Sequence, residues 1–128
     1  MKKASKKTLI RKNDKLWSQI IHARSDGRCE HCGKYGNLNA HHVFIGRANK
    51  HTRWSLKNGL GVAIGCHFKA HNSPALFYRE CRNYIGKETF EGNESDVLTT
   101  SMDKSKLTVE GYQNINTALK SLLEEYSK

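Results

Sequence analysis

No apolar run in this 128-residue sequence approaches the roughly twenty residues that a membrane-spanning helix needs. The basic residues at positions 2–7 are not followed by an apolar segment, so the sequence predicts no secretion signal. Internal repeats and low-complexity segments are also absent. With 37% hydrophobic residues, 27% charged residues and a mean hydropathy of −0.73, we expect a soluble single domain with a modest core.

Acidic residues are scarce over most of the chain. Residues 1–90 contain 18 Lys and Arg against 5 Asp and Glu, whereas residues 91–128 contain 4 against 7. The net charge of +10 is therefore concentrated in the part that also holds all 7 histidines. A basic surface attracts nucleic-acid phosphates, and its coincidence with metal-type residues favours a nucleic acid as the partner over a merely basic soluble protein.

A βαβ pattern is missing around the Cys-x-x-Cys pair, which argues against a thioredoxin-like redox role. The pair is Cys29 and Cys32, followed by Gly33; the other cysteines are Cys66 and Cys81. In a chain without a secretion signal, such a pair holds zinc more often than it forms a disulfide. The sequence therefore predicts a zinc knuckle closed by glycine turns.

The first half of the chain alternates between helix and short extended segments. Residues 1–12 are expected to be a mobile basic arm. Leu16, Trp17, Ile20 and Ile21 recur at helical spacing and predict a helix over residues 13–24. We expect a strand over 38–44, a basic turn over 46–50, irregular backbone or a second strand over 53–60, and a helix over 66–72.

The second half is predicted to be more helical. Ser73 as N-cap and Pro74 at the first position signal a helix that Gly86 ends. Residues 91–107 are polar and weakly periodic, which predicts a loop or a weak helix. Thr108 can cap a last helix with an apolar stripe of Tyr112, Ile115, Leu119, Leu122 and Tyr126. This stripe is expected to pack on the core, although a protein partner could also use it.

A set of histidines points to metal-dependent chemistry. His67 and His71 are four residues apart, so on a helix both imidazoles lie on one face, one turn apart. The doublet His41-His42 can supply a third imidazole and leave its neighbour free to accept a proton. This arrangement suits hydrolysis of a phosphodiester better than it suits a passive zinc site.

The order Cys-x-x-Cys, His-His, Asn, Cys-His, His resembles the HNH endonucleases, whose active site is a ββα-metal finger. The resemblance covers roughly residues 15–90 and looks closest to small phage-encoded members. From Asn58 onward the spacing is also similar to the nuclease domains of colicin-type toxins. The motifs that carry the resemblance are His41-His42-Val43, Arg53-Trp54, Asn58-Gly59 and Cys66-His67-Phe68-x-x-His71-Asn72-x-Pro74.

The resemblance implies a role for each matching residue. His41, His67 and His71 would hold one divalent metal, which we leave open among Mg, Mn, Zn, Ni and Co. His42 would be the general base. Asn58 would hold the loop between strand and helix and keep His42 oriented through a backbone hydrogen bond.

Several further expectations follow from the same family. Arg47, Lys50 and Arg53 could clamp phosphates of the DNA. The expected products carry a 3′-hydroxyl and a 5′-phosphate. The resemblance also implies a phage protein acting in the cytoplasm of the bacterial host. The lack of a separate sequence-reading domain favours low specificity or help from a partner.

The zinc knuckle departs from the family pattern. Many members have a second Cys-x-x-Cys pair before the active-site helix, but here Ala63 stands at its first position and only Cys66 matches. Cys29, Cys32 and Cys66 then leave one of four ligand positions open. Cys81 is the candidate for the fourth, with His22, His31 and His51 as weaker ones; the alternatives are a buried apolar Cys81 or a knuckle without metal.

Two rival functions remain open from the sequence. One is a non-catalytic DNA-binding module with a single zinc on Cys29, Cys32, His67 and His71, although 34 residues separate Cys32 from His67, where a conventional finger has about a dozen. The other is a phage accessory or inhibitory protein acting through its C-terminal helix. We predict an α+β fold with a ββα-metal core over residues 13–90, and a C-terminal loop and helix over 91–128.

Overall fold

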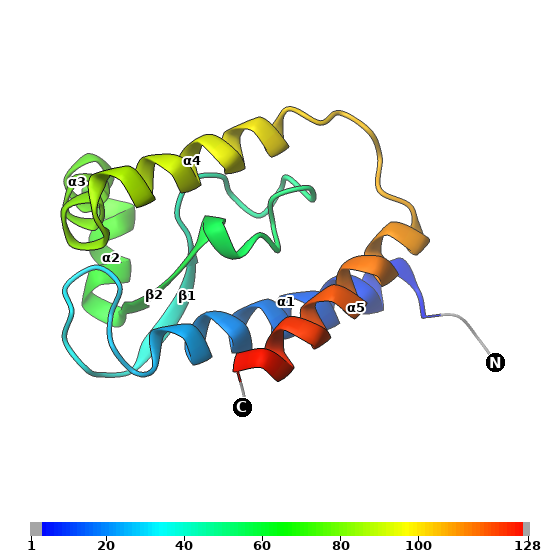
Figure 1. The fold of residues 1–128 in the computed structure, drawn as a ribbon, viewed down its shortest axis with the longest axis horizontal. Coiled ribbons are helices and arrows are strands. Elements are labelled where there is room, and N and C mark those ends of the chain that lie inside the picture. Colours follow the sequence, from blue (N-terminus) through cyan, green and yellow to red (C-terminus); the bar gives the residue numbers. More distant parts are fainter. Residues whose placement is uncertain (1–3, 127–128) are drawn as a thin grey trace.

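The structure is a computed structural model that describes residues 4–126, which form five α-helices around a two-stranded antiparallel sheet (Figure 1). The α+β class predicted from the sequence is confirmed. In chain order the elements are α1 (Lys6–Ser25), β1 (Leu38–His42), the 3-10 turn η1 (Leu56–Asn58), β2 (Gly59–Ala63), α2 (Ile64–Asn72), α3 (Pro74–Ile85), α4 (Lys87–Ser101) and α5 (Val109–Tyr126).

The N-terminal helix begins earlier than the sequence pattern predicts. The Oγ of Ser5 accepts a hydrogen bond from the backbone N–H of Thr8 at 3.1 Å, which caps the helix in the usual way for serine. Leu9 is buried against the core. The prediction of a mobile arm is therefore wrong for residues 6–12, and positions 1–3 lie outside the described residues.

The second strand explains how α1 approaches the sheet so closely. In β2, glycines alternate with apolar residues, and successive side chains of a strand point to opposite faces. A Cβ at Gly59 would lie 2.5 Å from the Trp17 ring and 2.7 Å from Ile21, so the glycine face receives α1. Leu60 and Val62 point to the other face, where they join the core beneath α2 and α3.

The sheet thus separates two apolar clusters. The first lies between α1 and α5, and the second lies between the sheet, α2, α3 and α4 (Figure 1). The buried members of the first are Leu9, Trp17, Ile20, Ile21, Trp54, Tyr112 and Leu119. The buried members of the second are Cys29, Leu60, Val62, Ala70, Phe77, Cys81 and Phe90.

The C-terminal helix packs along α1 (Figure 1). Thr108 caps it as predicted, because its Oγ1 accepts from the N–H of Gly111 at 3.1 Å. Inside the interface, Asn13 donates to the carbonyl of Tyr112 at 3.1 Å, and Asn116 donates to Asn13 at 3.0 Å. These buried bonds fix the register of the two helices. The apolar stripe of α5 is therefore used within the chain, and only its last member, Tyr126, is largely exposed.

Of the two alternatives predicted for residues 91–107, a helix is found over residues 91–101 and a loop over residues 103–107. Phe90 and Val97 of α4 are buried seven residues apart, which is two helical turns, and they anchor the helix to the core. Most other residues of α4 are polar and at least partly exposed, so its sequence shows little periodicity. Lys57 and Asp96 form an ion pair between η1 and α4.

The second strand lies later than predicted: β2 covers Gly59–Ala63, where the sequence indicated irregular backbone or a strand over 53–60. The starts of the next two helices agree closely with the predicted ones. Helix α2 starts at Ile64, two residues before the expected Cys66, and α3 starts at Pro74 as predicted. The backbone of Gly86 has a φ of 108°, which few other residues adopt, and it ends α3. Within residues 4–126 no helix combines the length and apolar character needed to cross a membrane.

Candidate metal and catalytic site

Strand geometry divides the histidine doublet between the two faces of the sheet. In the antiparallel pairing, His41 lies opposite Leu60 and His42 lies opposite Gly59. Paired residues share a face. His41 therefore points toward α2 with Leu60, while His42 points toward α1 with Gly59. Because the two neighbours face different elements, they are able to serve different chemical roles.

His41 meets the two histidines of α2. Ligand nitrogens of His41, His67 and His71 all lie within 4.8 Å of one another. The Nε2 atoms of His67 and His71 are 3.2 Å apart. Two nitrogens that each lie about 2.0–2.1 Å from one metal ion are separated by roughly 3 Å, so this spacing fits a shared cation. The structure thus brings together all three residues predicted as metal ligands, and this group could hold a metal ion.

The electrostatics of this group favour neutral, metal-binding imidazoles. Burial, together with the charges of the neighbouring imidazoles, lowers the pKa of His41 to about 4. Burial and the proximity of His71 also lower the pKa of His67. A protonated imidazole has no lone pair to offer a metal. At neutral pH His41 and His67 are therefore ready to bind a cation without first losing a proton.

His42 is held by a hydrogen bond and a stacked ring. Its Nε2 lies 2.8 Å from the carbonyl oxygen of Arg53. A carbonyl only accepts, so Nε2 carries the proton and Nδ1 of the neutral ring has the free lone pair. The ring stacks on Trp17, with centroids 4.2 Å apart and planes inclined by 6°. Burial lowers the pKa of His42, although the Arg53 carbonyl acts in the opposite direction.

The metal-type group and His42 share one cleft. It has a volume of about 370 Å³ and is lined by Ala40, His41, His42, Gly46, Arg47, His67 and His71. A neighbouring cleft of about 430 Å³ extends past His42 and Arg47 toward Asp14 and Trp17 of α1. A proton acceptor and a cation-binding group therefore open onto the same space, where a hydrolysed ester could reach both.

Asn58 braces the segment between the two strands. Its side chain is fully buried, and its Oδ1 accepts from the N–H groups of Phe44 and Ile45, each at 3.0 Å. Its Nδ2 donates to the carbonyls of Ile45 at 2.8 Å and Thr52 at 3.3 Å. Thr52 precedes Arg53, whose carbonyl holds His42. The side-chain bonds of Asn58 thus lie in the connection between β1 and β2, not between a strand and the helix, and its role in orienting His42 stays a prediction.

The three basic residues predicted to clamp phosphates lie in different environments. Arg47 is 70% exposed and lines the cleft of the histidines. Lys50 lines a separate cleft, with Lys6 and the segment before α5. Arg53 is buried, so the prediction that it offers its guanidinium to DNA is wrong. Its Nε and Nη2 donate to the two carboxylate oxygens of Asp14 at 2.9 and 2.7 Å.

Asp14 is a site residue that the sequence analysis missed. Besides its two bonds with Arg53, its carboxylate accepts from Nε1 of Trp54 at 2.8 Å and lies 3.5 Å from Arg47. It thereby fixes the short segment whose carbonyl orients His42. Asp14 is 39 residues from Arg53 in the sequence, and no local motif marks the pair. An acidic residue within a strongly basic segment was the only signal available.

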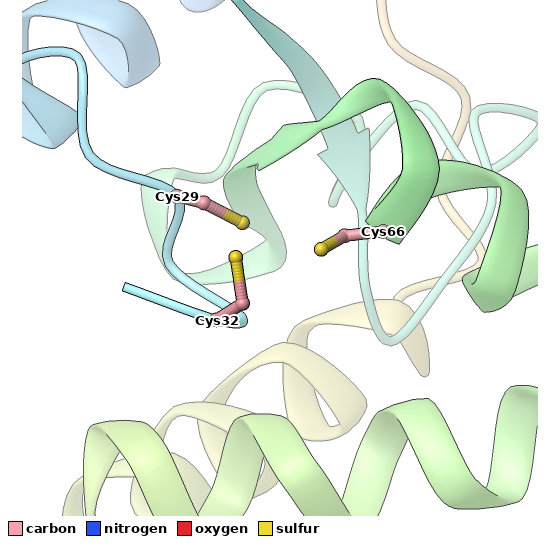
Figure 2. Close-up of side chains that lie close together, drawn as sticks. All are labelled: Cys29, Cys32 and Cys66. Atoms are coloured by element: carbon pink, nitrogen blue, oxygen red, sulfur yellow. The ribbon is translucent and has the colours of Figure 1, made fainter. Parts of the chain in front are cut away.

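Three of the four cysteines form a second metal-type group. The thiols of Cys29 and Cys32, from the loop after α1, point toward that of Cys66 at the start of α2 (Figure 2). Their sulfur atoms lie within 4.8 Å of one another, so this group could also hold a metal ion. Gly33, with a φ of 78°, closes the turn and donates to the carbonyl of Cys29 at 2.9 Å.

Backbone groups already favour a thiolate at Cys29. Burial raises its pKa, but N–H groups aimed at the sulfur outweigh burial, and the pKa lies below the ordinary value of 9.0. The donors include the N–H of Ala63 at 3.2 Å and that of His31 at 3.4 Å. Ala63 stands where the family pattern would place a fourth cysteine, and here it contributes a hydrogen bond in place of a ligand.

The predicted fourth ligand, Cys81, does not join this group among the described residues. It is completely buried in the second apolar cluster, and burial raises its pKa to about 12. The weaker candidates are engaged elsewhere or lie at the surface. His31 donates to Glu80 at 3.0 Å, His51 donates to the carbonyl of Ser105 at 2.7 Å, and His22 is exposed.

The rival ligand set of Cys29, Cys32, His67 and His71 is not assembled within residues 4–126. The two cysteines group with Cys66, and the two histidines group with His41. A single zinc shared by all four is therefore excluded by this arrangement. The chain presents two separate metal-type groups, one of thiols and one of imidazoles.

Comparisons of the chain with protein-family models, curated proteins and solved structures found no match.

Proposed function

We propose that the protein is a metal-dependent endonuclease that hydrolyses DNA phosphodiester bonds at a site of the HNH, or ββα-metal, type. The main observation in support of this proposal is the arrangement of four imidazoles in one cleft. Three converge within 4.8 Å of one another, while His42 points to the other face of the strand and is hydrogen-bonded through Nε2. A purely structural metal site has no need for this fourth, separately oriented ring.

The secondary structure around the site supports the same proposal. The ligands come from β1 and from α2, and β2 connects directly into α2. A ββα unit with the histidine doublet on its first strand and two histidines on its helix is the arrangement that the HNH resemblance implies. Asn58, at the end of the connection between the strands, holds that connection by four hydrogen bonds.

The donor set fits a divalent transition metal. Three neutral imidazoles suit Zn, Ni, Co or Mn better than Mg, which prefers oxygen ligands. HNH enzymes also work with Mg, so a panel of ions is needed in the assay. When bound, the cation would neutralise charge that develops on the phosphate and on the departing 3′ oxygen.

His42 would take the proton from the attacking water. The Arg53 carbonyl fixes the tautomer, so the free lone pair is on Nδ1. The Trp17 stack limits rotation of the ring. Since His42 does not belong to the metal-type group, its lone pair remains available for the proton. Arg47, exposed at the rim of the cleft, is placed to bind a phosphate oxygen.

The thiol group would hold a structural zinc. Three cysteine ligands leave one of the four tetrahedral positions for a further ligand, such as water. The metal would tie the loop after α1 to the start of α2, which carries His67 and His71. Metal binding at the knuckle would thereby stabilise the helix of the catalytic group.

Cleavage of plasmid, linear and branched DNA with a panel of divalent ions tests the proposal. We expect metal-dependent nicking or cleavage by the wild-type protein. Replacement His42→Ala should abolish turnover while folding and metal content remain nearly unchanged. Gln113→Ala removes an exposed polar side chain of α5 that lines neither cleft of the site, and it serves as the control, for which we expect activity close to wild type.

Two outcomes would contradict the proposal. DNA cleavage that survives His42→Ala would remove His42 from the role of general base. DNA binding without cleavage under every ion, with one tightly bound zinc, would instead support the rival function of a zinc-stabilised DNA-binding module. The cysteine group is the feature that such a module would require.

A further inference from the structure

A second cleft, separate from the histidine cleft, is lined with lysines. It has a volume of about 410 Å³ and lies between the start of α1, residues 49–51, and the segment that joins α4 to α5. Its cationic residues are Lys6, Lys50, Lys104 and Lys106. Asp103 is the one acidic residue among the described residues that line it.

The ammonium groups of this lysine cleft lack acidic partners. Within residues 4–126, none of the four lysines takes part in an ion pair. Lys6 lies over the ring of Tyr112, with its Nζ 5.5 Å from the ring centroid. Burial, followed by the nearby positive charges of Arg53, Arg47 and Lys6, lowers the pKa of Lys50, although the charge of Asp14 acts in the opposite direction. Four cations around one hollow create a strong local attraction for an anion.

The two walls of the lysine cleft are joined by specific hydrogen bonds. Asn49 donates to the carbonyl of Ser101 at 3.1 Å, and His51 donates to that of Ser105 at 2.7 Å. These residues flank Lys50 on either side. They therefore hold the segment that carries Lys104 and Lys106 opposite Lys50. The lysines lie on a braced surface rather than on unconnected surface loops.

The lysine cleft is close to the proposed cleavage site along the chain. Gly46 and Arg47 line the histidine cleft, whereas residues 49–51 line the lysine cleft. Arg47 and Lys50 are three residues apart, so their Cα atoms are separated by at most about 11 Å. Successive phosphates of one DNA strand advance by about 3.4 Å along the helix axis. A strand bound in one cleft can therefore reach the other within a few nucleotides.

We propose that the lysine cleft binds the phosphate backbone of the DNA a few nucleotides from the bond that is cleaved. This inference rests on the proposed nuclease function for the identity of the polyanion. The chemistry selects a polyanion because four cations without acidic partners line a hollow with few apolar side chains. The cleft would fix where the strand runs, while the histidine site would perform the hydrolysis.

Salt-dependent binding of a labelled duplex tests the lysine cleft. Fluorescence anisotropy is measured without added divalent metal, so that cleavage does not interfere, over a range of salt concentrations. The double replacement Lys104→Gln with Lys106→Gln removes two proposed phosphate contacts. The control, Lys87→Gln with Lys120→Gln, removes the same net charge from exposed positions on α4 and α5 outside the cleft.

The expected results differ between the two double variants. Each phosphate contact contributes about 0.9 to the slope of log affinity against log salt, so the cleft variant should lose nearly 2 from the slope. Its affinity at low salt should fall roughly tenfold or more, whereas the control should change the slope little. Asp103→Asn removes the acidic residue and should strengthen binding. Thermal melting confirms that each variant is folded.

The experiments distinguish failure of the lysine-cleft proposal from failure of the nuclease proposal. Equal slopes for the two double variants, or no binding by the wild type, would overturn the lysine cleft as a DNA site. If the cleft variant loses affinity but the wild type cleaves no DNA with any metal, the cleft stands as a nucleic-acid site and the nuclease proposal fails. If His42-dependent cleavage is found with unchanged slopes, only the lysine cleft is rejected.

Discussion

The imidazole of His42 lies flat against the indole of Trp17, with ring centroids 4.2 Å apart and ring planes inclined by 6°. The indole is itself held by its Nε1, which donates to the carbonyl of Ser55 at 2.9 Å. Gly59, opposite His42 in the sheet, leaves the space that the indole fills. The stacking contact, the hydrogen bond of the indole and the space at Gly59 therefore together orient the His42 ring.

Loss of the Trp17 stacking surface should lower turnover by more than its effect on stability would suggest. We expect Trp17→Leu to reduce kcat for DNA cleavage by at least about tenfold, because a misplaced base loses much of its contribution. Trp17→Phe keeps an aromatic face and should retain more activity. Initial rates of plasmid nicking, measured where all variants are folded, provide the comparison.

Ile20→Val is the control for this series, since Ile20 is buried in the same cluster as Trp17. It should cost about 1 kcal/mol of unfolding free energy and leave kcat nearly unchanged. If Trp17→Leu and Ile20→Val reduce kcat to the same degree at matched stability, the stack with His42 has no positioning role.

Asn58→Ala should affect both folding and catalysis. The replacement leaves the buried N–H groups of Phe44 and Ile45 without their acceptor, which we expect to cost about 2–4 kcal/mol of unfolding free energy. The Arg53 carbonyl would lose its fixed position, so kcat should fall more than the KM for DNA rises. Urea unfolding and steady-state kinetics measure the two effects. Asn72→Ala, at an exposed position of α2, should change neither appreciably.

Metal content should separate the roles of the cysteines. Cys29→Ala should remove one equivalent of metal and lower the unfolding free energy by several kcal/mol, because metal binding here contributes to folding. Cys81→Ala serves as the counterpart, since Cys81 is buried but lies outside the thiol group. It should keep its metal and lose only packing. Elemental analysis with thermal unfolding, with and without a chelator, checks both.

The opposite pattern of metal content would change the proposed ligands of the zinc knuckle. Loss of metal from Cys81→Ala would identify Cys81 as the missing fourth ligand. A Cys29→Ala variant that melts like the wild type would mean that no structural metal is bound at the thiols.

The ion pair of Asp14 with Arg53 should give a pH-dependent contribution to stability. Burial raises the pKa of Asp14, but hydrogen bonds from Arg53 and Trp54 outweigh it and hold the pKa below 3.8. A carboxyl whose pKa is depressed on folding stabilises the protein above its unfolded pKa, and this stability is lost as the pH falls through the folded value. Asp14→Asn should therefore cost about 2–3 kcal/mol at pH 7, and this cost should decrease as the pH falls below 3.8, so that it is smaller at pH 3.

Urea unfolding of the wild type and Asp14→Asn at both pH values measures this difference. Asp96→Asn removes an exposed partner of Lys57 and should cost under about 1 kcal/mol. A deficit of the same size at pH 7 and pH 3 would show that the charge of Asp14 is not what stabilises Arg53.

The sequence predicted the parts of the site that depend on local geometry. The four-residue spacing of His67 and His71 places both imidazoles on one helical face wherever α2 is located. The rings of the His41-His42 doublet lie on opposite faces of the sheet because neighbours in a strand face opposite ways. For such features, identifying the element is enough to place the side chains.

Features that depend on contacts between residues far apart in the chain could not be predicted from the sequence in this way. Arg53 looks like an exposed phosphate clamp until Asp14, 39 residues earlier, is found beside it. The residues of α4 show weak periodicity because only Phe90 and Val97 are deeply buried. The stacking of Trp17 on His42 likewise requires knowing that two glycines of β2 admit α1. Such contacts are set by the packing of whole elements.

One consequence concerns the last helix. Asn13, Asp14 and Trp17 follow one another on α1, and through them this helix touches α5, the Arg53 segment and the His42 ring. Residues more than forty positions beyond His71 thus support the helix against which the His42 ring stacks. Shortening the chain before α5 would loosen the backing of that ring, even though every histidine of the cleft would still be present.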